Sequence, residues 1–208
     1  MKVLLVHGLG RSSLSMALLA KRLSRSGYRP EFFGYSALAE PQPRIVARLV
    51  KRLRHLARDK GEIGLVGHSF GGLLLREACA RVPELRVRHL VMLGTPNQPP
   101  RLAARIYRWL PFRLLRGSCG QCLADASWYK RLPSPTSPYT VVAGTIGWRG
   151  RMSPFGGERN DGVVAVSETS VNAGEAPIEM PVVHTLMMNS KAVYRLIERT
   201  FSKVRRDG

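Results

Sequence analysis

The sequence predicts an α/β fold in which about six mostly parallel strands form one sheet with helices on both faces. Three observations predict it. Short β-type runs alternate with helical patterns along the 208 residues. The strand at the amino terminus is continuously apolar, which is typical of a strand buried on both faces. The length and the 44% hydrophobic content suit one domain with a sizeable core and are short for two.

The amino-terminal part of the chain contains two strand patterns and two helix patterns. Residues 2–6 form a β-type run, and residues 29–35 form another. Between them, Ser12 or Ser13 is expected to cap a helix. The apolar stripe of this helix consists of Leu14, Leu18, Leu19 and Leu23. Residues 44–60 then carry apolar side chains at three- and four-residue steps, which predicts an amphipathic helix over the sheet.

The other elements are arranged around residues 63–78. This stretch predicts a short buried strand, a tight turn and a helix that stops around Pro83. Ser69 lies at the turn, between Gly67 and Gly71. The spacing is typical of a nucleophile elbow, in which a serine sits on a strained strand-to-helix turn with its hydroxyl exposed. The glycines are needed because a Cβ at either position would collide with the neighbouring strand or helix.

Three further strands are predicted at residues 87–93, 138–146 and 178–183, and a last helix at 191–204. The one departure from the alternation of strand and helix is residues 97–137. This segment is bounded by prolines and rich in arginine and large apolar residues, which include Tyr107, Trp109 and Phe112. A basic helix with such residues on one side is typical of a helix in an anionic membrane interface. The alternative is an ordinary surface helix packed on the sheet.

The charge is strongly unbalanced, with 33 Lys and Arg against 14 Asp and Glu and a formal net charge of +19. Such a field attracts anionic partners, which could be nucleic acid, anionic membrane lipid or an acidic substrate. Nucleic acid is disfavoured, because the sequence has no zinc-finger spacing, aromatic ribonucleoprotein motif or block of like charges. Alternatively, the arginines only solvate the outer faces of helices.

Targeting signals and cysteines both bear on the compartment. The first apolar run is too short for a signal peptide, and no run approaches about 18 apolar residues. We therefore expect a cytoplasmic protein, at most peripheral to a membrane. The odd, low cysteine count fits reduced thiols. Cys119 and Cys122 have redox-motif spacing, but two free thiols or an incidental disulfide is the simpler interpretation.

These features resemble the α/β-hydrolase superfamily, above all its bacterial lipase and esterase branch. The similarity spans almost the whole chain, and the order of serine, acid and histidine is the one that this fold uses. The segments that carry it are His7-Gly8-Leu9-Gly10, Gly67-His68-Ser69-Phe70-Gly71-Gly72, Gly94-Thr95-Pro96-Asn97, Asn160-Asp161-Gly162-Val163-Val164 and His184. The resemblance implies a single α/β-hydrolase domain over residues 1–208 with residues 97–137 as a lid-like insertion.

The chemistry of acyl transfer gives each of these residues a role. Ser69 would attack an acyl carbonyl, and its hydroxyl needs a base to take the proton. His184 is the best base, because it follows a strand that ends at the same edge of the sheet as Ser69. Of the other histidines, His7 is expected beneath the loop that follows the first strand, and His68 within the elbow. His55 is expected on a basic helix face, and His89 at the opposite edge of the sheet. Asp161 would orient the imidazole, and Glu158 in the same loop is the rival acid.

The oxyanion hole would use the backbone N–H groups of Leu9 and Phe70. The resemblance implies a serine hydrolase that cleaves small-molecule or lipid esters through an acyl-enzyme, with the insertion shielding an acyl pocket. A thioesterase, an amidase or an acyltransferase would need the same triad. A non-catalytic module that binds anionic membranes or nucleic acid is the alternative from another class. No metal cluster, phosphate loop or dinucleotide fingerprint is visible, so no cofactor is expected.

Overall fold

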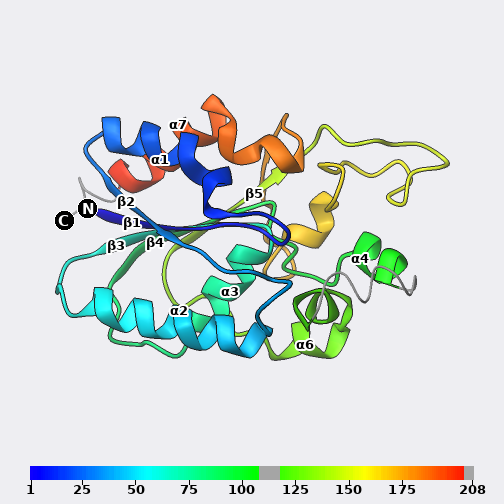
Figure 1. Cartoon of the computed structure of the whole chain (residues 1–208). Coiled ribbons are helices and arrows are strands. Elements are labelled where there is room, and N and C mark those ends of the chain that lie inside the picture. The colour runs from blue at the N-terminus through cyan, green and yellow to red at the C-terminus, as the bar shows by residue number, and fades with distance from the viewer. Residues whose placement is uncertain (108–117, 204–208) are drawn as a thin grey trace.

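The computed structural model of the chain describes residues 1–107 and 118–203. Its centre is a six-stranded sheet with the order β2-β1-β3-β4-β5-β6, in which every neighbouring pair is parallel (Figure 1). The strands are β1 Lys2–Val6, β2 Arg29–Phe33, β3 Ile63–His68, β4 Val87–Leu93, β5 Tyr139–Gly144 and β6 Ile178–Met180. The predicted α/β fold with a mostly parallel sheet is confirmed, although β2, β5 and β6 end earlier than the sequence pattern suggested.

Helices cover both faces of this sheet. Figure 1 shows α1 and α7 over one face and α2, α3 and α6 over the other. The helices are α1 Ala17–Arg25, α2 Gln42–Ala57, α3 Phe70–Cys79, α4 Arg101–Tyr107, α6 Ala126–Arg131 and α7 Lys191–Lys203, with short 3-10 helices η1 Ser13–Met16, η2 Val166–Thr169 and η3 His184–Asn189. In the part of the chain that the structure describes, no helix is both long and apolar enough to cross a bilayer.

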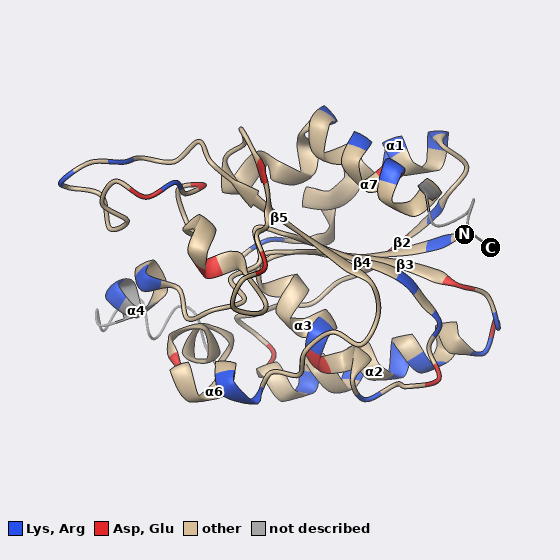
Figure 2. Ribbon diagram, turned by 180° about the vertical axis from the view of Figure 1, so that it is seen from behind, with Lys and Arg blue, Asp and Glu red and all other residues tan. Residues whose placement is uncertain are grey.

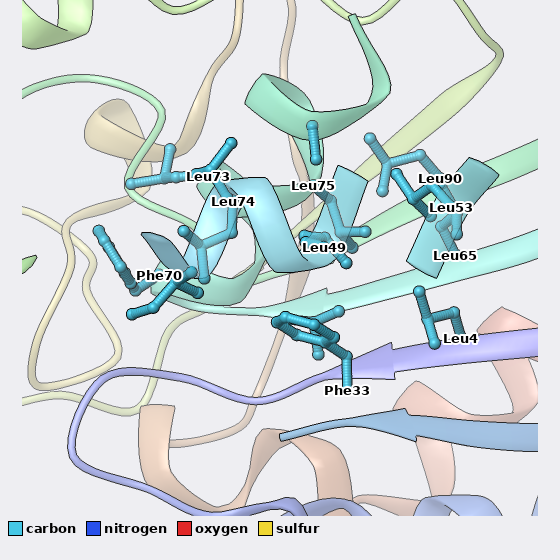
Figure 3. Close-up of a cluster of buried hydrophobic side chains, with 14 of the residues drawn as sticks. Leu4, Phe33, Leu49, Leu53, Leu65, Phe70, Leu73, Leu74, Leu75 and Leu90 are labelled. Carbon is cyan, nitrogen blue, oxygen red and sulfur yellow. The ribbon is translucent and has the colours of Figure 1, made fainter. Parts of the chain in front are cut away.

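Each face of the sheet has its own buried cluster of apolar side chains. Figure 3 shows the larger one, in which Leu53 of α2 lies near Leu65 of β3 and Leu90 of β4. The second cluster joins Val3 and Leu5 of β1 to the inner sides of α1 and α7. Because the side chains of a central strand point alternately to the two faces, both clusters require apolar residues along β1 and β3, as the sequence has.

The first helix differs from the prediction at its start. Residues 13–16 form a 3-10 turn before α1, and the Ser12 side chain makes no capping hydrogen bond. The turn changes which residues face the sheet, so Met16 is buried whereas Leu14 is 82% and Leu18 41% exposed. The predicted stripe was therefore wrong for Leu14 and Leu18 and right for the buried Leu19 and Leu23. A 3-10 turn has three residues instead of 3.6, which shifts the register of the first turn.

Candidate active site

Ser69 lies between β3 and α3 in a strained backbone conformation. Its φ of 52° and ψ of −124° fall where non-glycine residues are rarely found. The turn is tight because two glycines permit it. A Cβ on Gly67 would lie 2.5 Å from Gly72 Cα, and one on Gly71 would lie 2.4 Å from the Val6 carbonyl oxygen. The predicted collisions with the helix and with the neighbouring strand are thus present in the structure.

The loop that follows β1 runs beside this turn. A Cβ on Gly8 would lie 3.0 Å from Ser69 Cβ, so the loop backbone passes against the serine. Phe70 opens α3, where backbone N–H groups have no partner within the helix. Among the described residues, the N–H groups of Leu9 and Phe70 donate no hydrogen bond. Both N–H groups are thus unused donors, and Leu9 lines the same cavity as Ser69.

His184 opens η3, and its ring is bonded to Asp161. Nδ1 of His184 donates to Asp161 Oδ2 at 2.7 Å, and both side chains are buried. The backbone joins the same two residues, because the His184 N–H donates to the Asp161 carbonyl oxygen at 2.9 Å. With Nδ1 as donor, Nε2 of the neutral ring carries a lone pair and can accept a proton.

Asp161 is fixed by its own turn. Its Oδ1 accepts hydrogen bonds from the N–H groups of Val163 at 2.9 Å and Val164 at 2.7 Å, while Oδ2 faces His184. The rival acid Glu158 is bound elsewhere, to the Ser167 N–H and to Arg101. Against the effect of desolvation, these hydrogen bonds from Ser167 and Arg101 hold the pKa of Glu158 below its usual value. Of the two acids that the sequence offered, the structure brings Asp161 to the histidine.

A cavity of about 400 Å³ connects the serine and the histidine. Ser69, His184, Leu9 and Val163 are part of its wall. The loop after β4, α4 and the helical residues 118–124 give the cavity an apolar wall through Pro96, Pro100, Leu102, Ala103 and Leu123. The polar part of the wall also includes Arg11, His68 and Thr185. In the described part of the chain, no hydrogen bond joins Ser69 Oγ to the His184 ring. The two groups share a chamber whose size and lining suit an apolar acyl group.

A family model described as the alpha/beta hydrolase family matches residues 3–200. The chain belongs to this family. The mature lipase BlEst2 from Bacillus licheniformis has the same fold at 18% identity, with a TM-score of 0.77 over 96% of this chain and 91% of that one. Phospholipase PlaB from Legionella pneumophila is 14% identical, with a TM-score of 0.67 over 100% of this chain and 63% of that one.

A third solved structure comes from work on LipS and LipT, two metagenome-derived lipolytic enzymes. It is 16% identical to this alpha/beta hydrolase, with a TM-score of 0.69 over 99% of this chain and 93% of that one. At these identities the likeness is one of fold. None of the curated proteins compared with the chain matches it.

The other histidines of this alpha/beta hydrolase have different partners. His7 stacks on Tyr35, with ring centroids 4.2 Å apart, and its Nδ1 is 2.9 Å from the Gly8 carbonyl oxygen. His68 Nε2 is 3.0 Å from the His184 carbonyl oxygen. Burial lowers the pKa of His7 and, more strongly, that of His68. Both rings are thus neutral and support the loops around Ser69. His89 lies in β4, and His55 is exposed on α2.

Rival nucleophiles and metal sites are not found in the described residues. Cys79, Cys119 and Cys122 are free thiols, and burial raises the pKa of Cys79 and of Cys119 to about 12. Thiols with such pKa values hold little thiolate at neutral pH and are poor nucleophiles. Within residues 1–107 and 118–203, no group of three His, Cys, Asp or Glu side chains could hold a metal ion.

The insertion at residues 97–137 contains α4, the helical residues 118–124 and α6. Trp109 and Phe112, which were predicted to shield an acyl pocket, lie outside the described residues, as does the side chain of Tyr107. The predicted role of these three residues stays a prediction. The described part of the insertion does supply one wall of the cavity beside Ser69.

Sequence reasoning missed the residue that fastens this insertion to the rest of the molecule. Arg76 of α3 is only 5% exposed. Its Nη1 donates to Asn97 Oδ1 at 2.8 Å, and its Nε and Nη2 donate to the Pro133 carbonyl oxygen at 3.1 and 3.0 Å. The guanidinium therefore holds both ends of the insertion against the helix that follows Ser69. The only signal in the sequence was an arginine directly after three leucines.

A second missed contact joins the insertion to the loop that carries Asp161. Arg101, the first residue of α4, binds Glu168 at 2.8 Å and Glu158 at 2.5 Å. Glu168 is buried and also accepts a hydrogen bond from the Ala165 N–H at 2.9 Å. The start of the insertion and the acid loop are thus joined by a two-carboxylate ion cluster.

Proposed function

We propose that the protein is a serine hydrolase that cleaves carboxylic esters through a Ser69-His184-Asp161 triad. One observation carries the proposal. A serine on a strained turn and a histidine bonded to a buried aspartate line the same apolar cavity. A hydroxyl, a base and an orienting carboxylate are the groups that acyl transfer from serine requires.

In this mechanism, Nε2 of His184 takes the proton of Ser69 as Oγ attacks the ester carbonyl. Asp161 stabilises the imidazolium that forms, and it holds the ring with Nδ1 as the donor. The negative charge that develops on the carbonyl oxygen is met by the free N–H groups of Leu9 and Phe70, each typically worth about 3 kcal/mol. The alcohol leaves with the proton from His184, and water, activated by the same base, resolves the acyl-enzyme.

The missing hydrogen bond between Ser69 and His184 is compatible with this role, because such bonds often tighten only in the substrate complex. The apolar wall that α4 and residues 118–124 give to the cavity favours a substrate with an acyl chain. The fold likeness to BlEst2, named a lipase, and to PlaB, named a phospholipase, agrees with a lipid-like ester. A thioesterase, an amidase or an acyltransferase would use the same triad and differ only in the pocket.

The first test is labelling with a fluorophosphonate probe, which reacts with an activated serine and requires no knowledge of the substrate. We expect the wild type to be labelled, and Ser69→Ala and His184→Ala not to be labelled. Ser167→Ala, which changes an exposed serine of η2, is the matched control and should be labelled like the wild type.

Rates with p-nitrophenyl esters of increasing chain length would then define the acyl pocket. If Ser69→Ala were still labelled, Ser69 would not be the nucleophile. No labelling of the wild type, even with micelles present, would favour a non-catalytic binding module on this fold. Faster turnover of a matched thioester or anilide than of the ester would change the substrate class and leave the triad intact.

A further inference from the structure

The loop after β5, residues 145–157, turns large apolar side chains into solvent. Trp148 is 61%, Met152 80% and Ile146 55% exposed. We call this segment the β5 loop. It contains no acidic residue and two arginines, Arg149 and Arg151. A folded protein gains nothing in stability from exposing a Trp and a Met together, so the exposure calls for a binding partner.

The β5 loop is held in one shape by its own hydrogen bonds. The Trp148 carbonyl oxygen accepts from Ser153 Oγ at 2.7 Å and from Asn160 Nδ2 at 3.1 Å, and the Gly150 N–H donates to the Gly156 carbonyl oxygen at 2.9 Å. Phe155 of the same loop is 4% exposed. The loop therefore buries one of its large apolar residues and presents the others in a defined arrangement.

The arginines of the loop have no acidic partner. Among the described residues, neither Arg149 nor Arg151 forms an ion pair, and Arg149 donates only to the Thr145 carbonyl oxygen. The first acid after the loop, Glu158, is already paired with Arg101, and Glu179 of β6, the strand beside β5, is paired with Arg159. Two guanidinium groups beside Trp148 are thus free to bind anions from outside the molecule.

The loop lies at the edge of the sheet that carries the candidate active site. Figure 1 and Figure 2, which view the molecule from opposite sides, both show it extending beyond the strands at the same end as α4. At its base, Asn160 binds the Trp148 carbonyl oxygen, and the next residue is Asp161. A surface that bound the β5 loop would therefore lie on the side of the molecule where Ser69 and His184 line their cavity.

We propose that the β5 loop docks the protein on an anionic phospholipid bilayer. Trp148, Met152 and Ile146 would enter the boundary between headgroups and acyl chains, while Arg149 and Arg151 bind lipid phosphates. A second copy of the chain is a poor occupant, because each copy carries a net charge of +19. Docking would bring membrane lipid esters to Ser69, a consequence that rests on the proposed function, whereas the docking itself does not.

The test is co-sedimentation of the full chain with vesicles of phosphatidylcholine, with and without an equal part of phosphatidylglycerol. We expect the wild type to bind the vesicles with phosphatidylglycerol and to release as salt is raised. Arg149→Gln/Arg151→Gln should weaken this binding roughly 30-fold, since each arginine near an anionic surface contributes about 1 kcal/mol. Trp148→Ser/Met152→Ser should lose binding even at low salt.

Matched controls change the same chemistry elsewhere on the surface. Arg54→Gln/Arg58→Gln removes two exposed arginines at the end of α2, and Leu38→Ser removes an apolar side chain that is 69% exposed. These variants should bind nearly as the wild type does, and both the control and the loop variants should keep its rate with a dissolved ester. Ser69→Ala should bind vesicles normally, which separates docking from hydrolysis.

Three results would overturn the docking proposal. The wild type could fail to bind either vesicle, or the loop and control variants could lose binding equally. Alternatively, light scattering could show a dimer that Trp148→Ser/Met152→Ser converts to a monomer, in which case a second copy covers the loop. If the wild type bound vesicles through the β5 loop but was not labelled by the fluorophosphonate probe, the docking proposal would stand and only the proposed hydrolase function would be rejected.

Discussion

Thr95 lies directly against Gly72. A Cβ built on Gly72 would be 2.1 Å from Thr95 Oγ1 and 2.8 Å from its Cγ2. The Thr95 hydroxyl is buried and, among the described residues, has no hydrogen-bond partner. The Thr95 side chain, just after β4, thus packs against the first turn of α3, the helix that follows Ser69.

Gly72→Ala should lower the free energy of unfolding by about 1–3 kcal/mol, because the added methyl group overpacks the contact with Thr95. Thr95→Ala alone should change it by less than about 1 kcal/mol, since the hydroxyl forms no bond to lose. The double variant should regain most of the loss, because Oγ1 and Cγ2 are removed. Urea titration of the wild type, the two single variants and the double variant measures the coupling between the two residues.

If the effects of the two substitutions on the free energy of unfolding were additive, the added methyl group would collide with a residue other than Thr95. Gly71→Ala/Thr95→Ala is the control without rescue, since Gly71 faces backbone oxygens.

Asp161→Asn should slow probe labelling and ester hydrolysis by roughly 10⁴-fold, the size of loss known for this exchange in serine-histidine-aspartate enzymes. The amide cannot stabilise the imidazolium of His184. Glu158→Gln should slow them less than about tenfold, because Glu158 contacts Arg101 and not the histidine. Rates measured with the same dissolved ester compare the two acids. If Glu158→Gln lowered the rate more than Asp161→Asn does, Glu158 would be the triad acid and Asp161 would not.

Arg76→Met should lower the free energy of unfolding by about 2–5 kcal/mol, because two buried acceptors, Asn97 Oδ1 and the Pro133 carbonyl oxygen, lose their charged donor. Arg76→Lys should lie between this variant and the wild type, since an ammonium cannot span both acceptors. Arg81→Met is the control, because it removes only an exposed pair with Glu77 and should cost less than about 1 kcal/mol. If Arg76→Met and Arg81→Met lowered the free energy of unfolding equally, Arg76 would not be the clamp that holds the two ends of the insertion on α3.

Buried His89 should make the fold sensitive to acid. Burial lowers its pKa from the ordinary value of 6.5, so the unfolded chain takes up a proton that the folded chain does not. The free energy of unfolding should therefore fall as the pH drops below 6.5. His89→Gln should make this slope shallower by up to about 1.4 kcal/mol per pH unit. Denaturant titrations over this pH range provide the measurement. At higher pH the two curves should run parallel, and an unchanged slope in acid would refute the assignment.

Much of the fold was predictable because its signals are local. Gly67 and Gly71 permit the turn at Ser69, and continuous apolar runs mark strands buried on both faces. His184 was expected at the edge of the sheet that carries Ser69, and Asp161 was expected from the resemblance of its segment to the family's acid-bearing turn, with Glu158 as the rival that only the structure separates from the histidine. The clamp at Arg76 was not predictable, because its partners lie 21 and 57 positions away and include main-chain oxygens. The exposure of Trp148 depends on how the β5 loop folds back on Asn160.

One guanidinium holds Asn97 and Pro133, so insertions of other lengths could begin and end at the same two anchors. Such a segment would still have to pack on the scaffold, because Trp128 stacks on Phe70 with ring centroids 6.1 Å apart and Cys119 is fully buried. Substrate range could thus change through the residues of the insertion that line the cavity, while its buried residues stay tied to the helix that follows the serine.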